Sequence, residues 1–143
     1  MKKIILIFFS ITIFITASTS REEYENKVSY YEEAIQSASD GYGMSQAVMK
    51  YNSFLTKDIE ATYKYLLSKL NSRKNLKNSF IATQEEWEKL RDKEFQMIEL
   101  SFKDSTGSIT GFAITTNKNM VLIDRLDYLT YLIPVEGDVG TIF

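Results

Sequence analysis

The sequence predicts an all-α fold, a small helical bundle with two long antiparallel helices and shorter helices that cover them. Apolar residues recur at steps of three and four along most of the chain, which is the period of a helix with one buried face. Short polar or glycine-containing stretches separate these segments, and short connections favour antiparallel neighbours. A length of 143 residues with a single proline fits one helical domain.

The first twenty residues are predicted to be a secretory signal peptide. Two lysines precede an apolar run over residues 4–15, and small residues at 16–20 follow it. A membrane-spanning helix needs about 20 apolar residues, which is more than this run contains. We therefore expect cleavage between Ala17 and Arg21, a mature single domain over residues 21–143, and a secreted protein that is free of the membrane. The alternative is that the segment stays uncleaved as an N-terminal anchor.

Two amphipathic helices are expected next, over residues 22–38 and 46–70. Their apolar stripes consist of Tyr24, Val28, Tyr31 and Ile35 in the first segment, and of Val48, Tyr51, Leu55, Ile59, Thr62, Leu66 and Leu70 in the second. Glycines at positions 41 and 43 are expected to interrupt the chain between the two helices. Ser45 is the expected N-cap of the second helix, because a serine side chain can accept a bond from a free backbone N–H.

A second long helix is expected over residues 76–102, after a polar bend at 71–75. Its inner face consists of Leu76, Phe80, Trp87, Leu90, Ile98 and Phe102. After a turn-rich loop at 104–108, residues 109–116 contain many β-branched side chains and favour an extended conformation. A last short helix is expected to stop at Pro134, with Met120, Ile123, Leu126, Leu129 and Leu132 or Ile133 facing inward.

The composition argues against most enzyme classes. The chain has no Cys and no His, which removes disulfides, thiolate nucleophiles, zinc–thiolate sites and the commonest general base. Adjacent carboxylates such as Glu85 and Glu86 diverge by about 100° on a helix, so they cannot flank one glycosidic bond. With 17 basic and 19 acidic residues, the chain lacks the positive charge of a nucleic-acid binder. We expect a binding protein with no catalytic residues, no metal and no cofactor.

One motif places polar and aromatic side chains on a helix face that otherwise points inward. Gln84, Trp87 and Arg91 are spaced three and four residues apart, so they lie within about 60° of one another. In the structural interpretation, Arg91 lies over the Trp87 ring and pairs with a carboxylate on the neighbouring helix, and Glu60 or Glu94 supplies the partner for a buried polar group. The alternative is direct contact with a ligand.

Five short motifs occur in a characteristic order along the chain. They are Ser45-Gln46-Ala47-Val48-Met49, Tyr63-x-x-Leu66-Leu67-x-x-Leu70, Ala82-Thr83-Gln84-x-x-Trp87-x-x-x-Arg91-Asp92, Gly107-Ser108-Ile109 and Leu122-x-x-Arg125-x-x-x-Leu129. In these motifs the chain resembles the lysozyme-inhibitor LprI-like N-terminal domain family of small secreted bacterial proteins, over residues 44–132. The resemblance implies a helical fold, a periplasmic or secreted location, and a structural or binding role for Tyr63, Gln84, Trp87, Arg91, Asp92 and Arg125.

The chain also differs from the pattern of that family. Family members usually carry cysteines, and Asn52 and Phe95 stand near two of those positions. Thr56 and Glu60 stand where the family often has Asp and Asn. The disulfides of the family are therefore absent here, and the stability of the domain has to come from packing.

The first functional hypothesis is an inhibitor of a peptidoglycan-cleaving enzyme such as lysozyme. Without residues 1–20, which include two lysines and no acid, the chain has 15 basic and 19 acidic residues, a net charge of −4 that complements the usually basic lysozymes. The expected contact loop, which would enter the enzyme cleft, consists of Asp104, Ser105, Thr106, Gly107, Ser108 and Ile109.

Two other functions fit the same sequence. An immunity protein against a toxin delivered into the periplasm needs the same compartment and the same kind of surface, and a neighbouring toxin gene would favour it. A structural or envelope-stress protein without an enzyme target would associate with itself through exposed aromatic residues, and light scattering would reveal such an oligomer.

Overall fold

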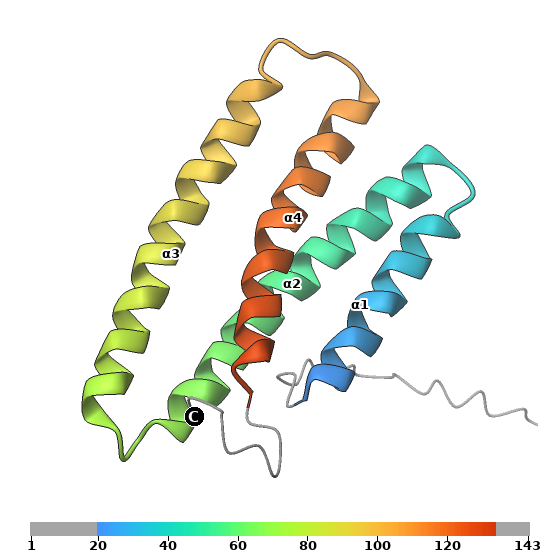
Figure 1. Ribbon diagram of the computed structural model, residues 1–143. Coiled ribbons are helices and arrows are strands. Elements are labelled where there is room, and N and C mark those ends of the chain that lie inside the picture. Colours follow the sequence, from blue (N-terminus) through green and yellow to red (C-terminus); the bar gives the residue numbers. More distant parts are fainter. Residues whose placement is uncertain (1–19, 134–143) are drawn as a thin grey trace, which may run out of the picture.

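The computed structural model describes residues 20–133, which form four α-helices joined by short turns (Figure 1). Helix α1 spans Arg21–Gln36, α2 spans Gly41–Lys69, α3 spans Lys74–Ser101 and α4 spans Ser108–Tyr131. The predicted all-α bundle is confirmed, and α2 and α3, with 29 and 28 residues, are its two long antiparallel helices. The expected signal peptide, apart from its last residue, and the expected stop at Pro134 lie outside the described residues.

Helix α2 is the central element of the bundle. It packs most extensively along α4 and next along α1, whereas α3 packs mainly on α4 (Figure 1). The buried apolar cluster is supplied chiefly by α2 and α4, and it consists of Tyr24, Tyr51, Phe54, Leu55, Ile59, Leu66, Leu70, Phe80, Leu122, Leu126, Leu129, Leu132 and Ile133. The short chain between α2 and α3 thus joins two helices whose common partner is α4.

The predicted apolar stripes are confirmed best on the central helix. All seven stripe residues predicted for α2 are buried, and so is Phe54. The prediction is wrong for Leu90 on α3 and Met120 on α4, whose exposed fractions are 53% and 61%. Helix α3 has one main neighbour, α4. An apolar stripe narrower than the predicted one is therefore enough to form the surface that α3 buries.

The start of α2 differs from the sequence prediction. The helix begins at Gly41 rather than at residue 46, and Asp40, not Ser45, is its N-cap. The Asp40 carboxylate accepts a hydrogen bond of 2.7 Å from the backbone N–H of Gly43. Glycine weakens a helix interior, but in the first turn the backbone N–H groups have no helical acceptor, so a good cap outweighs the two glycines.

The segment expected to be extended, residues 109–116, is the first part of α4. Gly107 precedes the helix with a φ of 125°, a backbone conformation that favours glycine. β-Branched residues lower helix propensity by only a few tenths of a kcal/mol each, on the order of the range between ordinary residues. Packing of α4 along α2 outweighs this weak preference.

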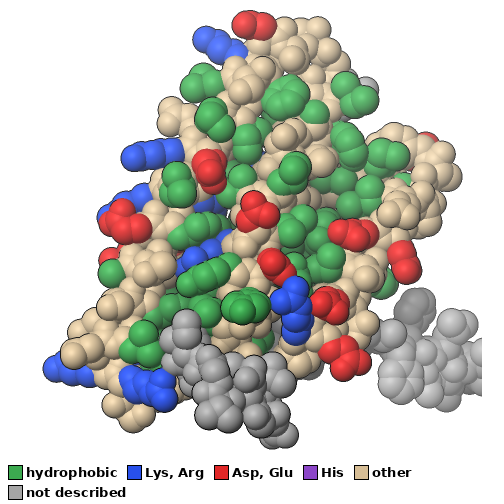
Figure 2. All heavy atoms as spheres, viewed as in Figure 1, with side chains coloured by type: hydrophobic (Ala, Val, Ile, Leu, Met, Phe, Trp, Pro, Cys, Tyr) green, Lys and Arg blue, Asp and Glu red, His purple; other side chains and the backbone are tan. Residues whose placement is uncertain are grey.

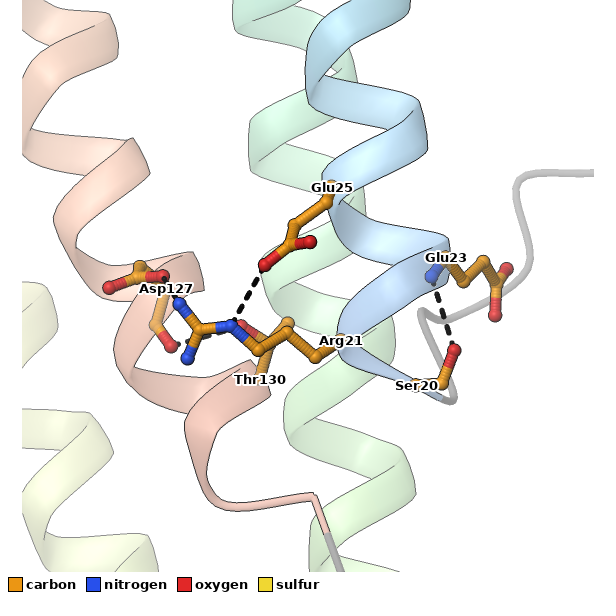
Figure 3. Close-up of polar contacts among 6 residues, drawn as sticks. All are labelled: Ser20, Arg21, Glu23, Glu25, Asp127 and Thr130. Atoms are coloured by element: carbon orange, nitrogen blue, oxygen red, sulfur yellow. Dashed lines mark hydrogen bonds and ion pairs between the residues drawn. The ribbon is translucent and has the colours of Figure 1, made fainter. Parts of the chain in front are cut away.

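Polar contacts tie the first turn of α1 to the last turns of α4 (Figure 3). Ser20 caps α1, because its hydroxyl accepts a 3.1 Å hydrogen bond from the backbone N–H of Glu23. The Arg21 guanidinium donates to Glu25 one turn later at 3.0 Å and reaches Asp127 of α4 at 3.5 Å. These contacts fix the N-terminal end of α1 beside α4, while the rest of α1 packs on α2.

Candidate binding surfaces

A buried arginine on α4 joins α3 and α4. Arg125 donates two hydrogen bonds to the side-chain oxygen of Gln84, from Nε at 3.2 Å and from Nη2 at 2.6 Å. Gln84, itself buried, donates in turn to Glu88 at 3.1 Å. Burial lowers the pKa of Arg125, and the nearby Tyr128 and Glu88 oppose that shift. An arginine guanidinium stays charged in proteins, and hydrogen bonds from a charged donor are strong. The two bonds from Arg125 to Gln84 therefore hold α3 against α4.

The indole ring of Trp87 contacts two guanidinium groups. The Cζ atom of Arg125 lies 5.2 Å from the ring centroid, and the Cζ atom of Arg91 lies at the same distance. Arg125 also lies 5.3 Å from the ring centroid of Tyr128. A cation over an aromatic ring contributes about 0.5–2 kcal/mol, depending on how dry the contact is. The motif predicted from its spacing therefore forms one cluster, which we call the arginine–tryptophan cluster: Gln84, Trp87, Arg91 and Arg125.

The other predicted motif residues have separate partners. Arg91 pairs with Asp92, its neighbour in the sequence, and no carboxylate on another helix within residues 20–133 contacts it, so the expected pairing between helices is wrong. Asp92 is exposed, and Glu60 is an exposed residue of α2 that pairs with Lys64. Tyr63 packs against Phe80, with 5.2 Å between the ring centroids. The arginine–tryptophan cluster is thus a contact between helices, and most of its polar groups are used inside the protein.

Replacing Gln84 by leucine is expected to lower the free energy of unfolding by about 1–2 kcal/mol, because the buried Arg125 guanidinium loses its acceptor. Urea denaturation followed by circular dichroism measures the change. The matched control is Gln96→Leu, which makes the same substitution at an exposed position of α3 and should change stability little. Equal effects of the two substitutions would contradict the structural role of Gln84.

A pair of asparagines joins α2 and α4 nearer the start of both helices. The Asn52 amide donates to the side-chain oxygen of Asn119 at 2.7 Å, and Asn119 donates to the backbone carbonyl of Val48 at 3.2 Å. Asn119 is buried, so these bonds satisfy a polar group inside the interface. Asn52 is also the residue that stands near a cysteine position of the LprI-like pattern. Two hydrogen bonds therefore join α2 and α4 here, and they fix the register of the two helices.

A charged pair between α1 and α2 was missed by the sequence analysis. The Asp58 carboxylate is fully buried and lies 3.6 Å from Nζ of Lys27, which also contacts Glu23 at 2.9 Å. Asp58 lies on the predicted apolar stripe of α2, three residues after Leu55 and four before Thr62. A carboxylate inside such a stripe needs a cation or several donors nearby, and that spacing was the available signal.

Two turns lie at the same end of the bundle, which we call the apical end: the α1–α2 turn at residues 37–40 and the α3–α4 turn at residues 102–107 (Figure 1). The first residues of α4, Ile109 and Phe112, line a pocket of about 470 Å³ together with Tyr42 and Met44 at the start of α2. Tyr42 and Ile109 are 76% and 74% exposed. The predicted contact loop therefore lies beside an exposed tyrosine that the sequence analysis did not connect with it.

The α3–α4 hairpin has further apolar side chains on its surface. Leu90, Met97 and Leu100 of α3 are exposed, and so is Met120 of α4. Figure 2 shows hydrophobic side chains interspersed with charged ones over the viewed face of the hairpin, and acidic side chains over α1. Within residues 20–133, no helix has an apolar stretch long enough to cross a bilayer. In the same range, no three acidic side chains gather where they could hold a metal ion.

Comparison with known proteins gives no relative: no family model matches the chain, and no similar curated protein or solved structure is found. The resemblance to the LprI-like family stays a prediction that depends on the five motifs.

Proposed function

We propose that this chain is a secreted binding protein that inhibits a peptidoglycan-cleaving hydrolase, and that its apical end makes the contact. The observation that carries this proposal is the position of Tyr42 and Ile109. They are the most exposed large hydrophobic residues in the described part of the chain, and both line one pocket although they are 67 positions apart in the sequence. Exposed aromatic and aliphatic anchors around a pocket are typical of protein–protein contacts.

The predicted contact loop supports the same surface. Residues 104–107 are exposed at the tip of the α3–α4 hairpin, where a cleft of another protein can receive them (Figure 1). Asp104 is the one carboxylate in this loop, and the whole chain has a net charge of −2. A negative body favours encounter with a basic hydrolase, while the apolar anchors determine how long the complex lasts.

The arginine–tryptophan cluster has a supporting role in this proposal. It holds α3 against α4 below the loop, through the bonds between Arg125 and Gln84. A loop on a braced hairpin loses less conformational freedom on binding than a loop on mobile helices. We therefore assign the motif residues a positioning role rather than direct contact with the hydrolase.

The test is protection of bacterial cells from lysis. The protein without residues 1–20 is added at micromolar concentration to a panel of structurally unrelated lysozymes, and lysis is followed by turbidity. We expect protection from at least one of them, and we expect Ile109→Asp to weaken protection about tenfold or more because a charge replaces an apolar anchor at the contact. Met97→Asp is the matched control, since Met97 is a similarly exposed apolar residue of α3.

Two results would count against the proposal. If every lysozyme of the panel lysed the cells at an unchanged rate, the proposed inhibitor function would be wrong. If Ile109→Asp and Met97→Asp weakened protection equally, the inhibitor function would stand, but the apical end would not be the contact surface.

A further inference from the structure

A groove lies between α1 and α2 on one face of this helix pair; we call it the α1–α2 groove. Its volume is about 800 Å³, within the range of small-molecule and ligand clefts. The residues that matter for its chemistry are Tyr30, Tyr31, Tyr42 and Phe54 on its apolar parts and Lys50 and Lys57 on its charged parts. The other lining residues are small or neutral, namely alanine, glycine, serine and one glutamine.

The large apolar residues that line the groove are all aromatic. The rings of Tyr31 and Phe54 are stacked with centroids 4.6 Å apart, and Tyr30 meets Tyr31 edge to face at 5.3 Å. Tyr30 is 64% exposed although it is part of this group. Among the described residues, no leucine, isoleucine, valine or methionine lines the groove. The exposed rings of Tyr30 and Tyr42 offer faces on which a flat ligand can lie, and the described lining lacks the aliphatic pockets that hold the anchor side chains of a bound peptide.

The charge of the groove is positive in a chain that has more acidic than basic residues. Lys50 and Lys57 line the groove, and no acidic residue of the described part of the chain lines it. Neither lysine forms an ion pair with any residue between 20 and 133, whereas Lys27, Lys64, Lys89 and Lys118 each contact a carboxylate. The two groove lysines are seven residues apart on α2, which is two turns or about 10.5 Å along the helix. A ligand with negative charges at a similar separation complements this pair.

Hydroxyl and amide groups complete the groove. Ser37, Ser53 and Gln46 line it beside the rings, and they can donate hydrogen bonds to ligand hydroxyl groups and accept bonds from them. Aromatic faces, neutral hydrogen-bonding groups and separated cations together match one ligand class. A sugar ring packs its C–H face on an aromatic ring, its hydroxyl groups bond to neutral side chains, and acidic sugars carry carboxylates.

We infer that the α1–α2 groove binds a glycan chain that carries carboxylate groups. The sugar rings lie on Tyr30 and Tyr42, and the carboxylates contact Lys50 and Lys57. This site goes beyond the proposed inhibition of a hydrolase, and it does not depend on it. Tyr42 lines both the groove and the apical pocket, but the two lysines line the groove alone, so variants of the lysines separate the two functions.

Isothermal titration calorimetry tests this inference with defined oligosaccharides. The probes are a hyaluronan hexasaccharide, which has one carboxylate in each disaccharide, and a chitin hexasaccharide, which is uncharged; a glutamate decapeptide is the acidic peptide control. We expect the hyaluronan hexasaccharide to bind, with an affinity that falls as salt rises. We expect the chitin hexasaccharide to bind more weakly and the glutamate decapeptide not to bind.

Variants of the groove and matched variants outside it complete the experiment. Tyr30→Ala should weaken hyaluronan binding about fivefold, because one stacking face is lost. Lys50→Gln combined with Lys57→Gln should weaken it further and reduce its dependence on salt. Tyr131→Ala and the pair Lys93→Gln with Lys103→Gln change exposed residues elsewhere and should leave binding as it is. Thermal melting by circular dichroism verifies that each variant is folded.

Three results would overturn the inference. The first is failure of the hyaluronan hexasaccharide to bind at low salt. The second is binding that the groove variants leave unchanged, which would place the glycan elsewhere. The third is equal or tighter binding of the glutamate decapeptide, which would identify the groove as a site for acidic peptides. Lysozyme inhibition by the lysine variants is measured in parallel, and it should be retained whatever the glycan result.

Discussion

Replacing Lys27 by methionine is expected to lower the free energy of unfolding by about 3 kcal/mol, because a buried carboxylate loses its cation. Asp58 is fully buried, and the Lys27 ammonium is the cation beside it, at 3.6 Å. Methionine keeps most of the apolar stem of lysine, so the substitution removes charge with little change in packing. The effect should appear in urea denaturation as a lower midpoint with an unchanged slope.

An exposed ion pair on α2 is the matched control for this prediction. Lys64 pairs with Glu60 on the same helix, and both side chains are about two-thirds exposed. Lys64→Met should therefore cost less than about 0.5 kcal/mol, which is typical of exposed pairs one turn apart. If Lys27→Met and Lys64→Met had the same effect, the contact between Lys27 and Asp58 would not be an important part of the α1–α2 interface.

A double variant tests whether the loss of stability comes from the unpaired charge of Asp58 or from the substitution at position 27 itself. Lys27→Met together with Asp58→Leu replaces the ion pair by two apolar side chains. Such replacements are often neutral or stabilising, because neither charge has to leave water. We expect the double variant to recover most of the stability that Lys27→Met loses. Failure to recover would mean that Asp58 also satisfies other polar groups on α1 or α2.

The fold was predictable because burial in this protein follows the helical period. Helix α2 has neighbours in α1 and α4, so its whole stripe is buried, from Val48 to Leu70. Leu90 belongs to a stripe of the same period, yet it is exposed because α3 packs mainly on one helix. Periodicity predicts which face of a helix is apolar. It does not tell how many neighbours cover that face, because the number of neighbours depends on tertiary packing.

The sites were predictable only where the partners are near in sequence. The grouping of Gln84, Trp87 and Arg91 follows from positions on one helix, and the structure confirms it. The bond between Gln84 and Arg125 links residues 41 positions apart, and helix geometry alone cannot place them together. The same holds for Tyr42 beside Ile109, which depends on the pairing of α2 with α4. The need for a cation near Asp58 could have been predicted from the sequence, because a carboxylate on an apolar stripe requires a partner.

Replacing Leu126 by alanine is expected to have the largest effect of all, about 3–4 kcal/mol in the free energy of unfolding. Leu126 is completely buried in the cluster that α2 and α4 supply. Alanine removes three carbon atoms and leaves a cavity, because rigid helices relax only partly around it. The chain has no cysteine and therefore no disulfide, so such a loss is a large fraction of the 5–15 kcal/mol that is typical of folded domains.

Two further variants are the controls for this prediction. Leu126→Met keeps nearly the whole side-chain volume and should cost less than about 1.5 kcal/mol, so a graded series distinguishes lost volume from general disruption. Leu100→Ala makes the same truncation at an exposed position of α3 and should cost little. Urea denaturation of the three variants measures the series. If Leu126→Ala and Leu100→Ala were equally mild, the α2–α4 interface could not be the main hydrophobic core, because truncation inside a core costs both transfer energy and a cavity.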